Sequence, residues 1–179
     1  MADKGHLILT AVGPDQVGLV EKISQFIVQH GCNIEDSKMA VFCGEFALII
    51  LITGESGTLV KTANAYHELE IHTGLTISIK TPSTRKPTES FLPYRLTASC
   101  MDHPGIVHKL SQILSRHGIN IESMDSETTP APISGIPLFT MTAHLVVPPS
   151  LSGQGWEAGL EDIGSRMNLE IRLFPVKDS

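Results

Sequence analysis

An internal repeat constrains this chain more than any other feature of its sequence. Residues 9–35 recur as residues 96–122, offset by 87 positions and without a gap. The tripeptide Leu-Thr-Ala opens both segments, and the pattern His-Gly-x-Asn-Ile-Glu closes both. Self-similarity of this extent indicates that the chain is built from two copies of one structural unit.

A polar segment separates the two copies. Residues 81–90 read TPSTRKPTES, with two prolines and no aliphatic side chain. This composition is typical of a connector between folded units. We therefore place the first unit at residues 1–81, a linker at 82–91 and the second unit at 92–179.

Each copy predicts the order strand, helix, strand, strand, helix, strand. Asp15 is the expected N-cap of the first helix, and Gly31 is its expected stop. In the second copy Asp102 takes the capping position and Pro104 the first turn. The elements expected in the first copy are a strand at 6–12, a helix from 15 to 30, strands at 32–42 and 45–53, a helix at 59–69 and a strand at 75–79. Their counterparts at the end of the chain are a helix at 156–167 and a strand at 169–174.

This element order predicts an α+β fold class. A βαββαβ unit of about 80 residues is ferredoxin-like, an antiparallel sheet with both helices on one face. Residues 46–52 read FALIILI and are apolar at successive positions, which indicates a strand buried on both faces. Because the helices cover only one face, the other unit or another chain is expected to cover the second. We therefore expect a homo-oligomer.

Composition narrows the possible partners. The 179 residues include 13 Lys+Arg and 19 Asp+Glu, giving a net charge of −6, and only 5% aromatics. Nucleic-acid surfaces need clustered basic residues, so no direct nucleic-acid contact is expected. The longest apolar run is far shorter than the ~20 residues of a membrane helix, so no membrane partner is expected. Three widely spaced cysteines predict core thiols in a reducing compartment, hence the cytoplasm.

Motifs that carry catalysis are not recognisable in the sequence. His67 and His72 are five positions apart, whereas a helical zinc motif needs histidines four apart. Neither a GxGxxG motif nor a P-loop occurs. Cys100 lies at the end of a predicted strand, where we expect a buried thiol rather than a nucleophile. We expect no catalytic residue, no metal, no cofactor and no enzymatic activity.

The repeated motifs resemble a known module. The pattern Asp-x-x-Gly-(Leu/Ile)-Val at 15–20 and 102–107, followed by a helix and His-Gly-x-Asn-Ile-Glu, resembles the ACT domain, which senses small molecules. The second copy also carries an insertion around TTPAPISGIPLF, residues 128–139. A double-ACT chain with this loop is similar to the glycine cleavage system transcriptional repressor family. The resemblance implies a regulatory protein that binds a small, glycine-like amino acid and restrains a separate DNA-binding activator.

The resemblance also implies a place for the ligand, where the loop after the first strand meets the second strand of an adjoining unit. A helix N-terminus suits a carboxylate, and Asp or Asn side chains can bind an ammonium group. The implied ligand-binding residues are Asp15, Gln16, Val17, Gly18, Leu19, Val20, Asn33, Ile34, Asp102, His103, Pro104, Gly105, Ile106, Val107, Asn120 and Ile121.

Simpler interpretations of these residues stay open. The two aspartates can be plain helix caps, and the two glycines can serve only tight helix–sheet packing. The two asparagines can bond a strand edge or a turn, and His103 can be a solvated loop histidine. The insertion at 128–137 fits a partner contact and a cover over the neighbouring unit equally well, and its three prolines and one glycine make an ordinary long hairpin loop the weaker interpretation.

Two functions of different classes therefore remain. The first is a cytoplasmic amino-acid sensor that modulates a partner such as a transcriptional activator of glycine cleavage. The alternative is a regulatory subunit or interaction scaffold for a metabolic enzyme, with no free ligand and with the site filled by its own side chains.

Overall fold

A computed structural model describes residues 4–83 and 91–176 of the chain. The chain divides into two compact units, Met1–Arg85 and Lys86–Ser179, called unit 1 and unit 2 below. Each unit is described by itself. Most of the expected linker, residues 84–90, lies outside the described residues.

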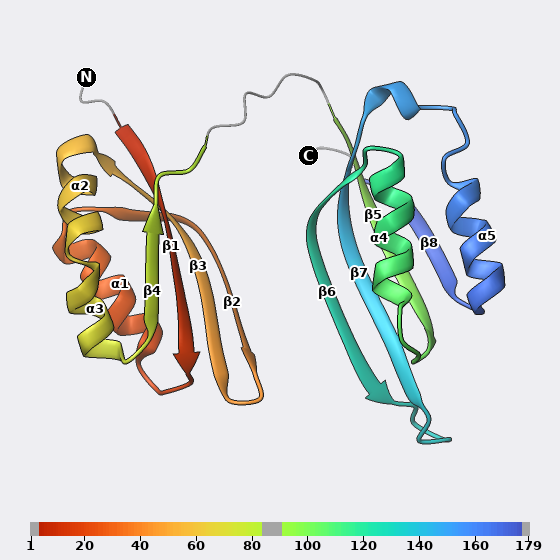
Figure 1. The fold of residues 1–179 in the computed structure, drawn as a ribbon, viewed down its shortest axis with the longest axis horizontal. Coiled ribbons are helices and arrows are strands. Elements are labelled where there is room, and N and C mark those ends of the chain that lie inside the picture. The colour runs from red at the N-terminus through yellow and green to blue at the C-terminus, as the bar shows by residue number, and fades with distance from the viewer. Residues whose placement is uncertain (1–3, 84–90, 177–179) are drawn as a thin grey trace. The chain divides into compact units, whose positions relative to one another are not determined.

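Unit 1 forms a four-stranded antiparallel sheet in the order β2-β3-β1-β4, with its helices on one face (Figure 1). Its elements are β1 (Lys4–Pro14), α1 (Leu19–Gln29), β2 (Asn33–Phe42), β3 (Glu45–Glu55), α2 (Ser56–Asn64), α3 (Tyr66–Thr73) and β4 (Thr76–Lys80).

The single helix expected at 59–69 is wrong, because α2 ends at Asn64 and α3 begins at Tyr66. Ala65 between them has φ −92° and ψ 2°, and its carbonyl accepts a bond from the amide of Glu68 at 3.0 Å. This tight turn breaks the helix without disturbing the apolar periodicity.

Unit 2 repeats the sheet in the order β6-β7-β5-β8. Its elements are β5 (Leu92–Met101), α4 (Ile106–Arg116), β6 (Asn120–Pro130), β7 (Pro137–Val147), the short 3₁₀ helix η1 (Pro149–Leu151), α5 (Ala158–Met167) and β8 (Glu170–Pro175). The expected fold class, two ferredoxin-like units with antiparallel sheets, is confirmed.

Each unit has its own hydrophobic core between the sheet and the helices. Leu9 in unit 1 and Leu96 in unit 2 occupy equivalent positions, and both are fully buried. Trp156, the only tryptophan of the chain, is buried in unit 2 with its ring edge against Tyr94 at a centroid distance of 5.8 Å. Two separate cores mean that each unit buries its apolar surface by itself.

The apolar strand β3 is buried on one face only. Its residues Phe46, Leu48, Ile50 and Ile52 point toward the helices and are buried, whereas Ile49 on the other face is 45% exposed. Unit 1 by itself thus buries one face of residues 46–52, and the cover expected over the second face, from the other unit or another chain, stays a prediction. The helices of unit 1 supply apolar side chains to one face of its sheet, and no element of unit 1 that the structure describes covers the other.

The two hairpins end differently. In unit 1, Cys43 and Gly44 both have positive φ, 51° and 82°, as a two-residue turn requires. Cys43 is therefore exposed at the tip, which corrects its expected place in the core. In unit 2 the strands pair as far as Pro130 and Pro137, so the expected loop of residues 128–137 shrinks to 131–136. The first and last residues of the insertion therefore belong to the paired strands β6 and β7.

Candidate functional site

Each unit places a short loop between its first strand and its first helix. The helices begin at Leu19 and Ile106, and the residues before them, Gly18 and Gly105, have φ 93° and 94°. L-residues with a side chain rarely adopt this left-handed conformation, so the loop shape requires glycine. The two loops therefore share one backbone conformation.

Three interpretations of the loop residues are wrong. Asp15 and Asp102 do not cap the helices, because the N-cap positions are the glycines and no side chain bonds the helix start. Pro104 lies before the N-cap of α4, outside the first turn. A tight turn after each aspartate moves the helix start three residues further along the chain. The glycines do not serve tight packing either, since a Cβ at either would meet nothing within 4 Å.

A backbone hydrogen bond fixes each loop to the neighbouring hairpin. The amide of Asp15 donates to the carbonyl of Gly44 at 2.8 Å, and the amide of Asp102 donates to the carbonyl of Pro137 at 2.9 Å. In both units the aspartate thus holds its loop through the main chain. Its carboxylate is left exposed, and among the described residues it has no hydrogen-bond or ion-pair partner.

The second half of the implied site lies at the other end of each sheet. Asn33 at the start of β2 is level with His6, near the beginning of β1, whereas the loop follows the end of β1 at Pro14. The helix between them has 11 residues, about 16 Å at 1.5 Å per residue. Asn120 and the loop of unit 2 are separated in the same way. A single unit cannot bring both halves onto one small ligand.

The implied residues differ in what they can contact. Leu19 and Ile106 are buried in the cores, and Ile34, Ile121 and Val107 pack against them. These five side chains are structural. The exposed ones are Asp15, Gln16, Val17, Gly18, Val20, Asn33, Asp102, Pro104, Gly105 and Asn120, with His103 half-buried.

The asparagines and His103 also have a described environment. Among the described residues the side chains of Asn33 and Asn120 form no hydrogen bond, so their bonding to a strand edge or a turn is not observed. The Nδ1 atom of His103 lies 3.3 Å from the carbonyl oxygen of Pro104. Both asparagines thus remain available to an external group, while His103 contacts its own loop.

Two features at the ends of the sheets were not anticipated from the sequence. In unit 1 the Nε2 atom of His6 lies 2.9 Å from the Glu35 carboxylate, beside a β-bulge in β2. In unit 2 a cavity of about 900 Å³ lies between α5 and the ends of β5 and β8, lined by Cys100, Leu160 and Leu169 among others. Gly164 of α5 also lines this cavity, and a glycine inside the predicted helix was the available signal.

Cys100 is buried at this cavity. Burial raises the pKa of its thiol, and the negative charge of Asp102 raises it further. The thiol is therefore protonated at neutral pH, and a protonated thiol is a poor nucleophile. The expectation of a buried thiol at this position is confirmed.

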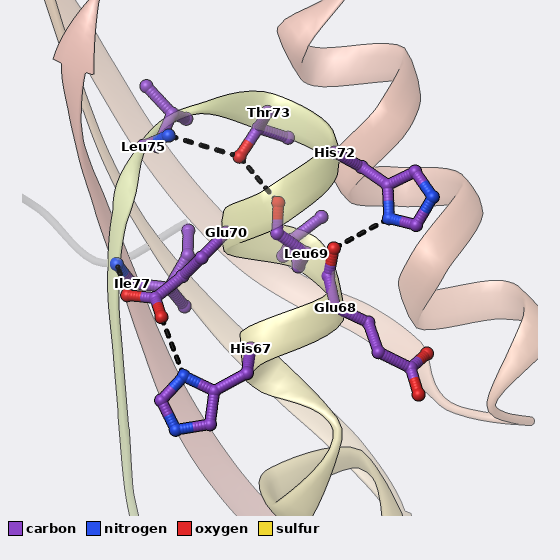
Figure 2. A network of polar contacts seen from close by, with 8 residues as sticks. All are labelled: His67, Glu68, Leu69, Glu70, His72, Thr73, Leu75 and Ile77. Atoms are coloured by element: carbon purple, nitrogen blue, oxygen red, sulfur yellow. Dashed lines mark hydrogen bonds and ion pairs between the residues drawn. The ribbon is translucent and has the colours of Figure 1, made fainter.

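In unit 1 a polar network lies at the equivalent place, between the last helix α3 and the last strand β4 (Figure 2). The Glu70 carboxylate accepts bonds from the amide of Ile77 at 3.0 Å and from Nδ1 of His67 at 2.8 Å. The bond from Ile77 and then that from His67 lower the pKa of Glu70. Nδ1 of His72 instead lies 2.6 Å from the carbonyl oxygen of Glu68, on another side of α3. The two histidines therefore face different groups.

Within residues 4–83 and 91–176, no group of three or more His, Cys, Asp or Glu side chains is arranged to hold a metal ion. None of the helices described there is both long enough and apolar enough to cross a membrane.

Comparisons with known proteins agree with this architecture. ACT-domain family models match residues 5–80 and residues 94–151. The glycine cleavage system transcriptional repressor of Escherichia coli is 27% identical over 133 residues, which span 73% of this chain and 69% of the relative.

Two solved structures share the fold over nearly the whole chain. A protein of unknown function from Galdieria sulphuraria has 27% identity and a TM-score of 0.82, covering 98% of this chain and all of its own. A second, provisionally described as a glycine cleavage system transcriptional repressor, has 22% identity and a TM-score of 0.70, covering 98% of this chain and 99% of its own. The chain belongs to the ACT-domain family as a tandem of two ACT domains, and it resembles the glycine cleavage system transcriptional repressors.

Proposed function

We propose that this protein is a non-enzymatic cytoplasmic regulator that binds a small, glycine-like amino acid at seams between ACT units. In that role it modulates a partner protein, such as a transcriptional activator of glycine cleavage. The family supports a regulatory role, and the relative from E. coli supports the link to glycine cleavage.

The single observation that carries the proposal is the pair of uncapped helix starts. Gly18 and Gly105 hold both loops in the same conformation, and no side chain occupies the first amide groups of either helix. Such amides and the helix dipole suit the carboxylate of an amino acid. The exposed carboxylates of Asp15 and Asp102 suit its ammonium group.

The position of the asparagines supports a seam rather than a site inside one unit. Because Asn33 and Asn120 lie at the opposite end of the sheet from their own loops, they can reach a ligand only at the loop of another unit. A ligand that contacts two units favours the arrangement in which both contacts form. Its differential affinity for that arrangement would pass the signal to the partner.

The alternative, a scaffold whose site is filled by its own side chains, predicts a different structure of the loops. It needs the aspartates to occupy the helix starts, and they do not. It also predicts that Asp102→Ala lowers stability by ~1 kcal/mol as a lost cap. We expect no such loss.

Isothermal titration calorimetry with glycine, serine and alanine tests the proposal. We expect binding of at least one of them to the wild type and at least tenfold weaker binding to Asp102→Ala, with an unchanged melting temperature. Asp125→Ala, an exposed aspartate of β6 in the same unit, is the matched control and should bind as the wild type does. No heat and no thermal shift with any of the three amino acids would refute the sensing role.

The partner is tested separately by affinity capture from native lysate with and without the amino acid that binds. Recovery of a transcriptional activator, altered by the amino acid, supports the proposal. Recovery of a metabolic enzyme, unaffected by any amino acid, supports the alternative.

A further inference from the structure

The sheet of unit 1 has an open face whose residues form regular rows across the strands. The registers of the three strand pairs place Asp36, Leu51, Ile8 and Lys80 side by side in one row. The next row is Lys38, Ile49, Thr10 and Ser78, and the third is Ala40, Ala47, Val12 and Thr76. Partners in a ladder point to the same side of the sheet, so all twelve side chains share the face that the helices do not cover.

The centre of this face is largely apolar and carries no charge. The six central positions, on β3 and β1, are aliphatic except for Thr10. Ile49 is 45% and Val12 51% exposed, although both neighbours of Ile49 on its strand are buried. Contiguous apolar surface of this kind, bounded by charged residues, marks an interaction site on a soluble protein.

The corresponding face of unit 2 has different chemistry. The registers place Arg95 opposite His144, Thr97 opposite Thr142, and Ser99 opposite Thr140. The charges of this face also have partners within it, since Arg95 stacks on the Phe174 ring at 5.1 Å and Arg172 pairs with Glu170. A polar, internally satisfied surface is a poor partner for an apolar one, because its groups would lose water without gaining bonds.

We propose that the open face of unit 1 binds the same face of a second copy of this chain, about a two-fold axis parallel to the strands. Such an axis passes between β3 and β1 and places β2 of one copy over β4 of the other. Leu51 then faces Ile8 of the partner subunit, and Asp36 faces Lys80 of the partner subunit. The row Asp-Leu-Ile-Lys of one copy thus meets the same row of the other copy in the opposite order. Apolar side chains then face apolar side chains, and the aspartate of one copy faces the lysine of the other.

The size of the face fits a specific contact. Strands of 10, 11, 11 and 5 residues, at about 3.4 Å per residue and about 4.8 Å between strands, make a face of roughly 600 Å² per copy. Two such faces approach the ~1,200 Å² at which specific interfaces begin. Sheets that pack face to face keep their strands within about 30° of each other, which preserves the rows.

The proposal goes beyond the function proposed above, because it concerns the open sheet face rather than the helix starts. It is tested without any amino acid, by sedimentation velocity on the full chain over a concentration series. Ile49→Lys puts a charge at the centre of the face, where it is half exposed in the single chain and therefore compatible with folding. We expect this variant to have half the mass of the wild type, or a dissociation constant at least tenfold higher.

Thr142→Lys is the matched control, because Thr142 holds the position of Ile49 in unit 2. We expect it to keep the mass of the wild type. Far-UV circular dichroism checks that both variants are folded. A monomeric wild type at all concentrations, or equal masses for the wild type and Ile49→Lys, would overturn the proposal.

A charge swap tests the alignment itself. Asp36→Lys alone and Lys80→Asp alone each place like charges opposite one another and should weaken the dimer. The double variant restores unlike charges across the two-fold axis and should recover at least half of the lost affinity. If the double variant is as weak as the sum of the single ones, the proposed alignment is wrong.

Discussion

The two units share an internal framework and differ in their outer surfaces. Both have the same sheet order, the same left-handed glycine before the first helix, and the same bond from an aspartate amide to the hairpin. Their open faces differ at almost every central position, with Ile49 and Val12 in unit 1 replaced by Thr142 and Ser99 in unit 2. The repeated features are those that shape the loops, whereas the surfaces exposed to partners have separate chemistry.

A second difference lies beneath the last helix of each unit. Glu70 and Gly164 both stand six residues before the last strand, yet they close the unit in different ways. Glu70 bonds the amide of Ile77, whereas a Cβ at Gly164 would meet the carbonyl oxygen of Leu169 at 2.9 Å. In unit 1 a carboxylate therefore joins the last helix to the last strand. In unit 2 the backbone of the last helix packs closely against the residue before the last strand, beside the cavity.

The largest expected effect tests whether the two cores are independent. Leu9→Ala and Leu96→Ala each remove a fully buried side chain and should lower stability by about 3 kcal/mol. Because Trp156 lies in the core of unit 2, its fluorescence reports on that unit, whereas far-UV circular dichroism reports on both. Leu96→Ala should shift the denaturation midpoint seen by Trp156, and Leu9→Ala should not. A shift of the Trp156 transition in both variants would show that the units unfold together.

A smaller effect on stability tests whether the left-handed glycine before the first helix has the same role in both units. Gly18→Ala and Gly105→Ala force a side chain into the left-handed region and should each cost about 1–2 kcal/mol, by chemical denaturation. Gly57→Ala in α2 is the control: a Cβ there meets nothing within 4 Å and its φ is not positive, so helix propensity should raise stability by about 0.5–1 kcal/mol. Equal losses of stability in the variants at positions 18 and 105 would mean that the two loops are equivalent. A loss at only one position would mean that they are not.

The glycines also show what the sequence could and could not predict. The repeat, the element order and the stop at Gly31, which has φ 70°, followed from periodicity and residue type. The helix start did not, because Asp15 satisfies the statistics of a cap while the turn at Gly18 excludes it from that role. The break at Ala65 was missed because one tight turn leaves the apolar spacing of its neighbours intact.

For the candidate site the sequence offers a set of residues, and these stay a prediction. The family resemblance implies the loop and Asn33, and only the strand register shows that they lie at opposite ends of one sheet. The apolar run at 46–52 predicts a second face in need of a cover, but only the strand registers show which side chains share that face. Register is a property of strand pairs, and a single strand does not encode it.

A pH effect in the acidic range is expected in unit 1, from Glu70. Since the pKa of Glu70 is lowered in the folded state, its charge stabilises the fold above the pKa of an unfolded glutamate. That stabilisation is lost as the pH falls through the lower, folded pKa. Glu70→Gln should therefore be less stable than the wild type at pH 7 and equal to it at the acidic end, measured by circular dichroism from pH 7 to pH 3.

The control for this pH effect is Glu68→Gln, because the Glu68 carboxylate points away from the network (Figure 2). This substitution leaves the bonds from Ile77 and His67 to Glu70 in place, so the pH effect of Glu70 should persist in it. The Trp156 signal should be the same in both variants, because unit 2 has Gly164 where unit 1 has Glu70. A pH-dependent difference in the Trp156 signal would contradict the assignment of the effect to unit 1.

The smallest expected effect concerns the chemical reactivity of the three thiols, two in unit 1 and one in unit 2. Cys43 is exposed at the hairpin turn, whereas Cys32 in unit 1 and Cys100 in unit 2 are buried. Ellman's reagent at pH 8 should therefore modify one thiol per chain at once, and Cys43→Ser should abolish that fast phase. Burial also raises the pKa of Cys100, so at a given pH its thiolate fraction is lower than that of an ordinary cysteine.

The slow phases of the thiol reaction then report on the stability of each unit separately, without any denaturant. Modification of a buried thiol requires the unit around it to open, so its rate follows the local stability of that unit. Leu9→Ala should accelerate the reaction of Cys32 alone, and Leu96→Ala that of Cys100 alone, which mass spectrometry of the labelled peptides resolves. If either substitution accelerates both thiols equally, opening of one unit is coupled to opening of the other, and the two cores are not independent in stability despite being separate in space.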